Sequence, residues 1–378
     1  MKKTMIALAA LGAMAGAAHA QSNVTMYGVV DMFVGESTTK TNFGGVPFNA
    51  VLPNNTTVGA TVNTMVKNGM SLNSGGLSGS RWGLRGSEDL GGGLKANFQL
   101  ESSISADTGA STGFTRTSKM GLSGGFGSIE MGRQYTQLFL LMDSFDAQGT
   151  SSFSATNAIF GTSLQAAFGN IGVAIPGANA ASMPQAPAVR WDNSLLYTSP
   201  NMGGFTGAVQ YAFGENGTPG ASAGRSIGLS AAYTIGSFAV QGVYETVKRP
   251  GAGAGSAKST GLGASYDFGM AKVLGQFITQ KDGYVNGLKE NGYVLSVAVP
   301  LGSAGSLNAG MGGENIKNAT SGVKLAKTSS YGLEYRYDLS KRTTLYAGMT
   351  QVKTKLAAPL PAGDTTDKLY GFGMRHKF

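Results

Sequence analysis

Arginines at alternating positions are the residues of this sequence best placed to do chemistry. Arg81 and Arg85 are four residues apart, so both lie on one face of an extended strand, opposite Trp82 and Leu84. A guanidinium group stays ionised at any physiological pH. Lining a narrow aqueous channel, whose low-dielectric walls focus the field, such groups favour the passage of anions. The alternative is that they pair with carboxylates such as Glu101 and contribute only to stability.

Catalytic and metal-binding side chains are scarce. The chain has no cysteine and two histidines, His19 and His376. His376 shares the apolar face of its segment, where an aromatic-belt position explains it better than a general base does. We therefore predict no enzyme activity, no metal and no cofactor. The net charge of +9 is spread along the chain rather than clustered, so we expect no nucleic-acid partner.

The N-terminus predicts export. Lys2 and Lys3 precede an apolar stretch over 5–18, and Ala18 and Ala20 are the small residues that a signal peptidase recognises. The stretch is shorter than the ~20 residues that a spanning helix needs. We expect a signal peptide over 1–20 and a mature chain over 21–378.

Composition narrows the class of the mature chain. Glycine accounts for 59 of 378 residues, and charged residues for 13%, about half the usual ~25%. So few charges disfavour an ordinary soluble protein. No later apolar run approaches spanning length, which argues against a helical membrane protein.

Alternation of apolar and polar residues indicates strands with one face in lipid and one in water. The last strand carries aromatic and apolar residues at alternate positions, and small or cationic ones between them: Tyr370, Phe372, Met374, His376 and Phe378 against Leu369, Gly371, Gly373, Arg375 and Lys377. One arginine at the bilayer midplane costs ~2–4 kcal/mol, so charged positions face the lumen. The same argument places further side chains inside: Lys95, Glu101, Glu334 and Arg336.

Sixteen segments follow this pattern, and the even number suits an antiparallel barrel. They are 24–34, 79–88, 94–104, 115–123, 128–135, 188–198, 204–214, 225–235, 238–248, 258–268, 271–281, 291–301, 306–315, 328–339, 342–353 and 368–378. Short turns alternate with longer connections, of which 35–78 and 136–187 are the longest. The predicted fold is all-β: a 16-stranded antiparallel transmembrane β-barrel, too wide for side chains to fill.

The connection 136–187 is too long and too apolar for a solvent-exposed loop. Its apolar residues include Leu138, Phe139, Leu140, Leu141, Phe145, Phe153, Ile159 and Phe160. We expect it to fold into the pore and narrow it; a loop covering the barrel mouth is the alternative. Its acids Asp143 and Asp146 are followed by no Asp or Glu from 147 to 189.

Several short segments, weak singly but specific in their order, resemble the general porins of Gram-negative outer membranes, of the beta-proteobacterial type. They are Val24-Thr25-Met26-Tyr27-Gly28, Ser80 to Gly86, Gly132-Arg133-Gln134, Asn193-Ser194, Tyr197-Thr198-Ser199-Pro200, Asp338 to Thr343 and Gly373 to Phe378. They cover the whole mature chain.

The resemblance implies a homotrimer in the outer membrane, in contact with lipid and lipopolysaccharide, with the third loop folded inside each pore. It implies a basic wall facing loop acids: Arg81, Arg85, Arg116, Arg133 and Arg190 against Asp143 and Asp146. Arg133 shares parity with Ile129 and Met131, so it points inward only if the strand ends there. A C-terminal Phe378 resembles the signal read by the outer-membrane assembly machinery.

We therefore predict an outer-membrane porin for passive diffusion of small hydrophilic solutes and ions, weakly anion-selective through the lumen arginines. Two alternatives remain: a substrate-specific channel for a sugar or organic acid, and an adhesin-type structural barrel. Steady conductance in a planar bilayer would distinguish a diffusion porin from an adhesin-type barrel.

Overall fold

The computed structural model describes residues 23–42, 47–51, 57–61, 64–161, 188–214, 224–249, 255–283, 287–357 and 363–378. The expected signal peptide over 1–20 and the second half of the 136–187 connection lie outside these residues. Among the described helices, none combines the length and the apolar character required to cross a membrane.

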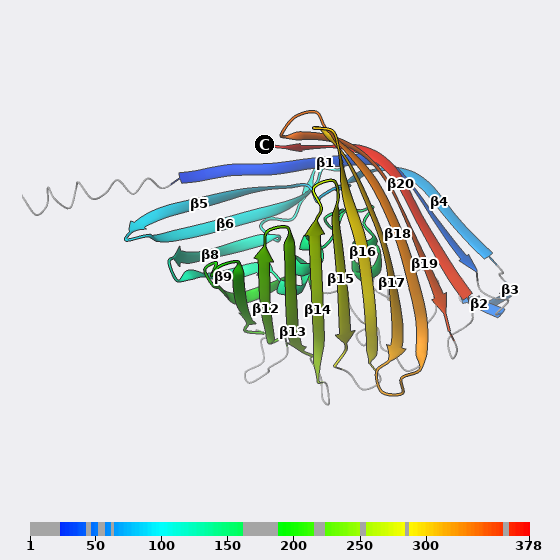
Figure 1. Cartoon of the computed structure of the whole chain (residues 1–378). Coiled ribbons are helices and arrows are strands. Elements are labelled where there is room, and N and C mark those ends of the chain that lie inside the picture. The colour runs from blue at the N-terminus through cyan, green and yellow to red at the C-terminus, as the bar shows by residue number, and fades with distance from the viewer. Residues whose placement is uncertain are drawn as a thin grey trace, which may run out of the picture.

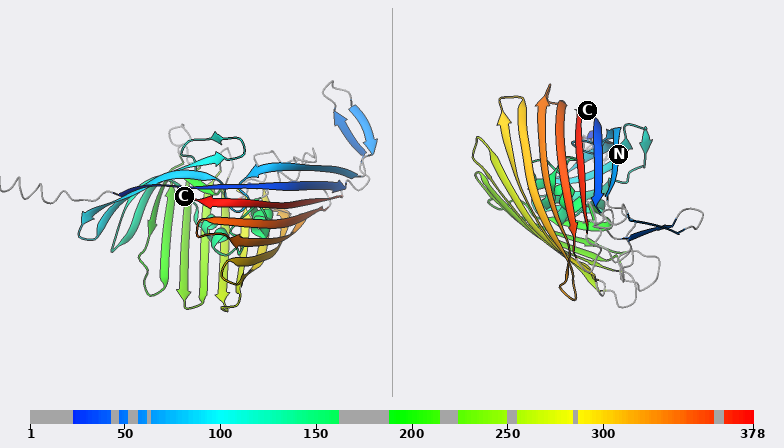
Figure 2. Two further views of the ribbon diagram at one scale, coloured as in Figure 1. Left: turned by 90° about the horizontal axis from the view of Figure 1, so that it is seen from above. Right: turned by 90° about the vertical axis from the view of Figure 1, so that its right-hand side faces the viewer.

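Antiparallel strands form one closed sheet (Figures 1 and 2). The strands are β1 (Asn23–Asn42), β4 (Thr64–Ser74), β5 (Arg81–Gly91), β6 (Leu94–Ser105), β7 (Ala110–Ser111), β8 (Thr117–Gly124), β9 (Gly127–Tyr135), β10 (Arg190–Thr198), β11 (Phe205–Ala212), β12 (Ser226–Ile235), β13 (Phe238–Lys248), β14 (Ser256–Asp267), β15 (Lys272–Lys281), β16 (Leu288–Leu301), β17 (Gly305–Asn318), β18 (Lys324–Asp338), β19 (Thr343–Leu356) and β20 (Gly363–Lys377).

The ring has sixteen strand positions within the described residues. β4 and β5 pair with successive halves of the same edge of β1, so they share one position, and the two-residue β7 only extends the edge of β6. The other edge of β1 pairs with β20, which closes the barrel. A closed ring leaves no unpaired edge, as a sheet surrounded by lipid requires. The predicted 16-stranded barrel is confirmed.

Residues 35–78 were predicted to be a long connection between strands, and this prediction was wrong in part. β1 continues to Asn42, and β4 returns beside it after a separate hairpin of β2 (Pro47–Val51) and β3 (Thr57–Thr61). This hairpin projects away from the ring in Figure 2. The alternation that marks β1 is lost after Val34, where Glu36 and Lys40 interrupt the apolar face, so the sequence pattern stops before the strand does.

Outward-facing side chains form an apolar band. Met26, Met120, Phe277, Tyr293 and Phe372 are each 50% or more exposed, while their strand neighbours face inward. Short turns join strands at one end of the barrel and longer connections at the other, and outer-membrane barrels carry the longer connections outside the cell.

The lumen holds a helix, α2 (Gln137–Ser144), and a π-helical turn, η1 (Asn157–Gly161). Thr136 caps α2 by accepting a hydrogen bond from the Phe139 backbone N–H. A core forms between this segment and the inner wall: Leu138, Leu141, Met142, Phe145, Ala155, Ile159, Phe160, Val243, Ile278 and Val294. Residues 136–161 of the loop therefore fold into the pore, as the apolar content predicted.

Candidate functional site

A cavity of about 440 Å³ lies between the inner wall and the folded-in loop. Five guanidinium groups line it: Arg81, Arg116, Arg190, Arg336 and Arg375. They come from β5, from the residue just before β8, and from β10, β18 and β20. Strands far apart in the sequence thus direct like charges into one space. We call these residues the arginine cluster.

Glu101 of β6 sits between two members of the cluster. Arg116 Nε lies 2.7 Å from Glu101 Oε1, and Arg81 Nε lies 3.5 Å from Oε2. The Tyr27 hydroxyl also donates to Oε2, at 3.0 Å. The single buried carboxylate therefore balances only one of the two arginine charges.

Tyr135 connects the other side of this pair to Arg190. Its hydroxyl accepts from Arg116 Nη2 at 3.1 Å and from Arg190 Nη2 at 2.6 Å. The Arg190 guanidinium also lies over the Tyr135 ring, 4.2 Å from its centroid, and Phe139 stacks on the same ring at 5.0 Å. A ring face holds a cation without neutralising it, so Arg190 keeps its full charge beside the cavity.

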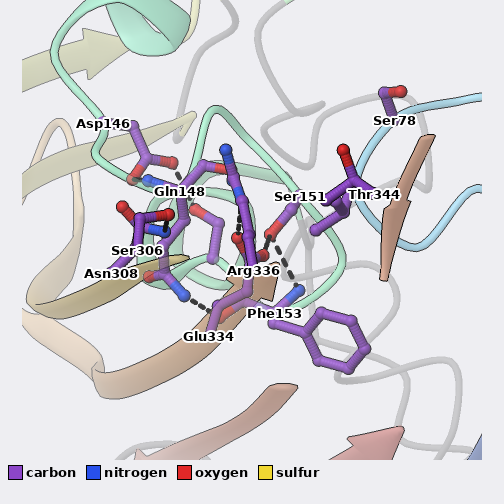
Figure 3. A network of polar contacts seen from close by, with 12 residues as sticks. Ser78, Asp146, Gln148, Ser151, Phe153, Ser306, Asn308, Glu334, Arg336 and Thr344 are labelled. Atoms are coloured by element: carbon purple, nitrogen blue, oxygen red, sulfur yellow. Dashed lines mark hydrogen bonds and ion pairs between the residues drawn. The ribbon is translucent and has the colours of Figure 1, made fainter. Parts of the chain in front are cut away.

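Arg336 ties the wall to the loop (Figure 3). Its guanidinium pairs with Glu334 and donates to the Gln148 carbonyl at 2.8 Å. Glu334 in turn accepts a hydrogen bond from the Ser151 hydroxyl at 2.7 Å. Arg375, by contrast, forms no ion pair within the described residues, and its buried Nε has no hydrogen-bond partner there.

The two loop acids have different surroundings. Asp143 is exposed, lines the cavity, and accepts from the Thr150 hydroxyl at 2.9 Å. Asp146 is buried within the loop, where it accepts from the backbone N–H groups of Gln148 and Thr150 and from the Ser154 hydroxyl. Burial raises the pKa of the Asp146 carboxyl above its usual range. Asp146 therefore holds the loop turn together and does not face the pore.

The segment between β4 and β5 dips inward onto a buried carboxylate. Asp31 is fully buried and accepts from the backbone N–H groups of Gly76, Leu77 and Ser78 at 2.8–3.0 Å. Tyr346 donates its hydroxyl to the same carboxylate.

This dip holds the tip of the loop. The Ser152 backbone N–H donates to the Gly76 carbonyl at 2.9 Å, and its hydroxyl to the Gly75 carbonyl at 3.0 Å. Phe153 packs nearby against Phe33. Asp31 holds the dip in place, and the dip holds the loop tip. Asp31 thereby positions one border of the cavity.

The structure places four predicted residues away from the cluster. Arg85 lies over the Tyr27 ring and lines a second lumen cavity of about 370 Å³. Lys95 is exposed near the short-turn end of β6. Asp146 is the buried loop residue described above, and Arg133 lies outside the lumen.

Arg133 pairs in the sheet with Ser118 and shares its face with Met131, which is 51% exposed. Its guanidinium contacts Asp192 and the Thr115 carbonyl. The alternation of β9 continues through Arg133, so its side chain points outward. Lys119, out of phase with Arg116 by sequence, lies on the lumen face opposite Gln99, because Arg116 precedes the first residue of β8.

Sequence reasoning did not assign Tyr135, the 75–80 dip or Arg375 to the site. Arg375 carried a signal, since it alternates with lipid-facing residues of the last strand. The dip carried none, because its glycines and serines look like any polar turn. Among the described residues, no group of three or more His, Cys, Asp or Glu side chains could hold a metal ion.

Comparison with known proteins agrees with this architecture. A family described as Gram-negative porin matches residues 7–357. Outer membrane porin protein 32 of Delftia acidovorans is 35% identical over 95% of this chain and 92% of its own. An outer membrane porin protein of Bordetella pertussis is 29% identical over the full length of both.

Among solved structures, the anion-selective porin from Comamonas acidovorans superposes with a TM-score of 0.69 at 28% identity, over 94% of this chain and 100% of that one. An OmpF complex from Salmonella typhi, at 17% identity and a TM-score of 0.61, shares the fold. A family match over most of the chain and a closed sixteen-position barrel point to one conclusion: this chain belongs to the Gram-negative porins and forms a channel in the outer membrane.

Proposed function

We propose that the channel conducts small hydrophilic solutes and ions by passive diffusion, with a weak preference for anions. The observation that carries this proposal is the arginine cluster, whose five cations share a cavity with one exposed acid, Asp143. Glu101 and Glu334 offset part of the charge. Because a low-dielectric wall focuses the remaining field into the pore, anions are concentrated there and cations are repelled.

Arg190 and Arg375 are the members to test, because neither has a carboxylate partner within the described residues. We expect the double variant Arg190→Gln/Arg375→Gln to shift the reversal potential in a salt gradient towards that of a non-selective pore. Arg133→Gln, which removes one positive charge from the outer face, should leave the reversal potential unchanged, whereas each of the single variants Arg190→Gln and Arg375→Gln should shift it. A double variant as anion-selective as the parent would refute the assignment.

A substrate-specific channel is a second candidate, favoured by the stacked pair of Tyr135 and Phe139 beside Arg190. An aromatic face next to a cation suits a planar organic acid. Titrating benzoate into one side of a bilayer distinguishes the two: a specific site gives saturable block that Phe139→Ala relieves, whereas a general pore gives none.

We also propose a homotrimer of the mature chain 21–378. A structural neighbour from Vibrio cholerae is described as a trimer form. Native mass spectrometry in detergent would show the trimer, and the mass of the protomer would show whether residues 1–20 have been removed.

Phe378 is proposed as the assembly signal. It closes the β1–β20 seam through reciprocal backbone bonds with Gly28, at 3.1 Å, and its side chain is 48% exposed. Deleting Phe378 should lower the amount of folded porin in the outer membrane while leaving refolding in detergent intact.

A further inference from the structure

Polar side chains cover one part of the inner wall on the short-turn side of the arginine cluster. They line the second lumen cavity, of about 370 Å³. Cross-strand pairing of β1, β5, β6, β8 and β9 arranges them in two rows: Thr25, Arg85, Gln99 and Lys119 in the first, and Asn23, Ser87, Asn97 and Glu130 in the second. Neighbouring strands are ~4.8 Å apart, and the two rows are ~7 Å apart. We call these residues the polar grid.

Tyr27 connects the polar grid to the arginine cluster. Its hydroxyl accepts a hydrogen bond from Gln99 Nε2 at 2.7 Å and donates one to Glu101 Oε2 at 3.0 Å. Arg85 follows Arg81 by four residues on β5, so it lies ~13 Å closer to the short turns. A solute that passes the cluster towards the periplasm therefore meets the polar grid next.

The polar grid carries one unpaired charge. Lys119 Nζ lies 2.8 Å from Glu130 Oε1, and these two charges cancel. No ion pair joins Arg85 to a carboxylate within the described residues. Its guanidinium lies over the Tyr27 ring, 5.1 Å from the centroid, and a ring face holds a cation without neutralising it. The grid thus presents one oriented guanidinium, which can bind a carboxylate through two parallel hydrogen bonds.

The uncharged members of the polar grid are amides and hydroxyls. Gln99 donates from its amide nitrogen to Tyr27, and Asn97 donates from Nδ2 to Ser123 Oγ at 2.8 Å. Each amide keeps its carbonyl oxygen as an acceptor, and the exposed hydroxyls of Thr25 and Ser87 can donate or accept. A ligand rich in hydroxyl groups matches this mixture, because each of its hydroxyls can also do both.

This composition is not general to the wall at the same height. At the short-turn ends of β11 and β12, the inward positions are small residues: Thr206, Ala208, Ala232 and Thr234. A wall that only has to be wet needs no more than these. The amides and the guanidinium are concentrated on β5 and β6, which is the pattern of a binding site.

We propose that the polar grid binds sugar acids, which combine one carboxylate with several hydroxyl groups. The carboxylate lies on Arg85, and the hydroxyl groups bond to the amides and hydroxyls of both rows. The inference rests on the proposed diffusion of hydrophilic solutes and goes beyond it. The arginine cluster selects by charge, whereas the polar grid also recognises the hydroxyl groups.

Single-channel recording in a planar bilayer tests the proposal, with glucuronate as the probe. Acetate carries the carboxylate without the hydroxyl groups, and glucose carries the hydroxyl groups without the carboxylate. Arg85→Gln and Asn97→Ala each remove one part of the recognition. Lys95→Gln is the matched control, because Lys95 is exposed on the same face of β6 but does not line the cavity.

We expect glucuronate to interrupt the parent current saturably, at lower concentration than acetate or glucose. Arg85→Gln should raise the half-maximal concentration about tenfold or more, because a charge-assisted hydrogen bond is lost. Asn97→Ala should raise it less and keep the parent's reversal potential in potassium chloride. Lys95→Gln should bind as the parent does.

Three results would overturn the proposal: equal interruption by all three probes, unchanged glucuronate binding in Arg85→Gln or Asn97→Ala, and equal weakening in Lys95→Gln. An anion-selective parent whose current glucuronate never interrupts would overturn the polar grid alone. A parent without ion preference that still binds glucuronate through Arg85 and Asn97 would support the grid and contradict the role of the arginine cluster.

Discussion

Among the side chains of the arginine cluster, the number of acidic partners varies. Arg81 and Arg116 share Glu101, and Arg336 is paired with Glu334. Arg190 rests on an aromatic ring, and Arg375 has no carboxylate partner in the described structure. The first three are fixed in position by their partners. The last two have no ion-pair partner and, together with one charge of the Arg81 and Arg116 pair, supply the uncompensated charge.

Asp146 should make stability depend on pH in the acid range. Burial raises its pKa in the folded protein, so between the ordinary aspartate pKa and this raised value the folded state binds more protons than the unfolded state. Its contribution is therefore present at lower pH and lost as pH rises through the folded pKa. Thermal unfolding followed by circular dichroism should show this slope in the parent and a reduced slope in Asp146→Asn. An unchanged slope would contradict the assignment.

Tyr346 should matter through Asp31 and the loop tip. Tyr346→Phe removes one of four donors to a buried carboxylate, which should cost about 1–3 kcal/mol in unfolding free energy. Because the dip that Asp31 organises holds Ser152, the open-channel current should also become noisier. Tyr331→Phe, on the outer face, is the control. Quiet channels in Tyr346→Phe would remove Asp31 from the positioning of the loop.

Sequence reasoning worked for residues inside regular strands. Glu334 and Arg336, both within β18, could be directed inward because alternation is strict there. It did not extend to residues at strand ends or in turns, where alternation gives no direction: Arg116 precedes its strand, and Gly76 acts through its backbone N–H. The sequence also could not show that the Asp146 carboxylate accepts hydrogen bonds within its own loop and so does not face the pore.

Between elements, glycine explains how a loop fits inside the barrel. A Cβ at Gly263 would lie 2.3 Å from the Phe145 ring, one at Gly292 2.5 Å from Phe160, and one at Gly348 2.4 Å from Phe153. The glycine-rich composition therefore includes positions where the inner wall must be bare to seat aromatic side chains.

Gly348→Val should displace the loop tip, because the added side chain occupies the space of Phe153. We expect a changed single-channel conductance together with a lower unfolding temperature. Gly242→Val is the matched control, since a Cβ there meets no atom within 4 Å. The same conductance in both variants would show that the tip does not depend on this contact.

Strand positions were predictable because each strand must alternate between two solvents. The predicted 238–248 coincides with β13, and most other boundaries agree within a few residues. β4 was missed because Asn68 and Ser74 interrupt an outward face that otherwise carries Val66, Met70 and Leu72. Its partner is the C-terminal half of β1, from Met32 to Asn42, and no local sequence pattern reveals this pairing.

For the whole molecule, the ion preference should depend on salt. The screening length falls from ~10 Å at 0.1 M to ~3 Å at 1 M ionic strength. The field of the arginine cluster should therefore reach less of the pore cross-section at high salt. We expect the anion-to-cation permeability ratio, measured from reversal potentials at a fixed gradient ratio, to fall over this range. A ratio independent of salt would point to selection by size instead.

The loop also has a mechanical consequence. α2 packs against β13 and β14, whereas the tip at Ser152 is bonded to the dip beside β1. β13 lies eight strand positions from β1 around the sixteen-position ring, on its opposite side. The loop thus connects opposite sides of the barrel. Any deformation that makes the ring elliptical would have to stretch or compress the loop. We therefore expect lateral tension in the membrane to change the width of the aperture through this segment.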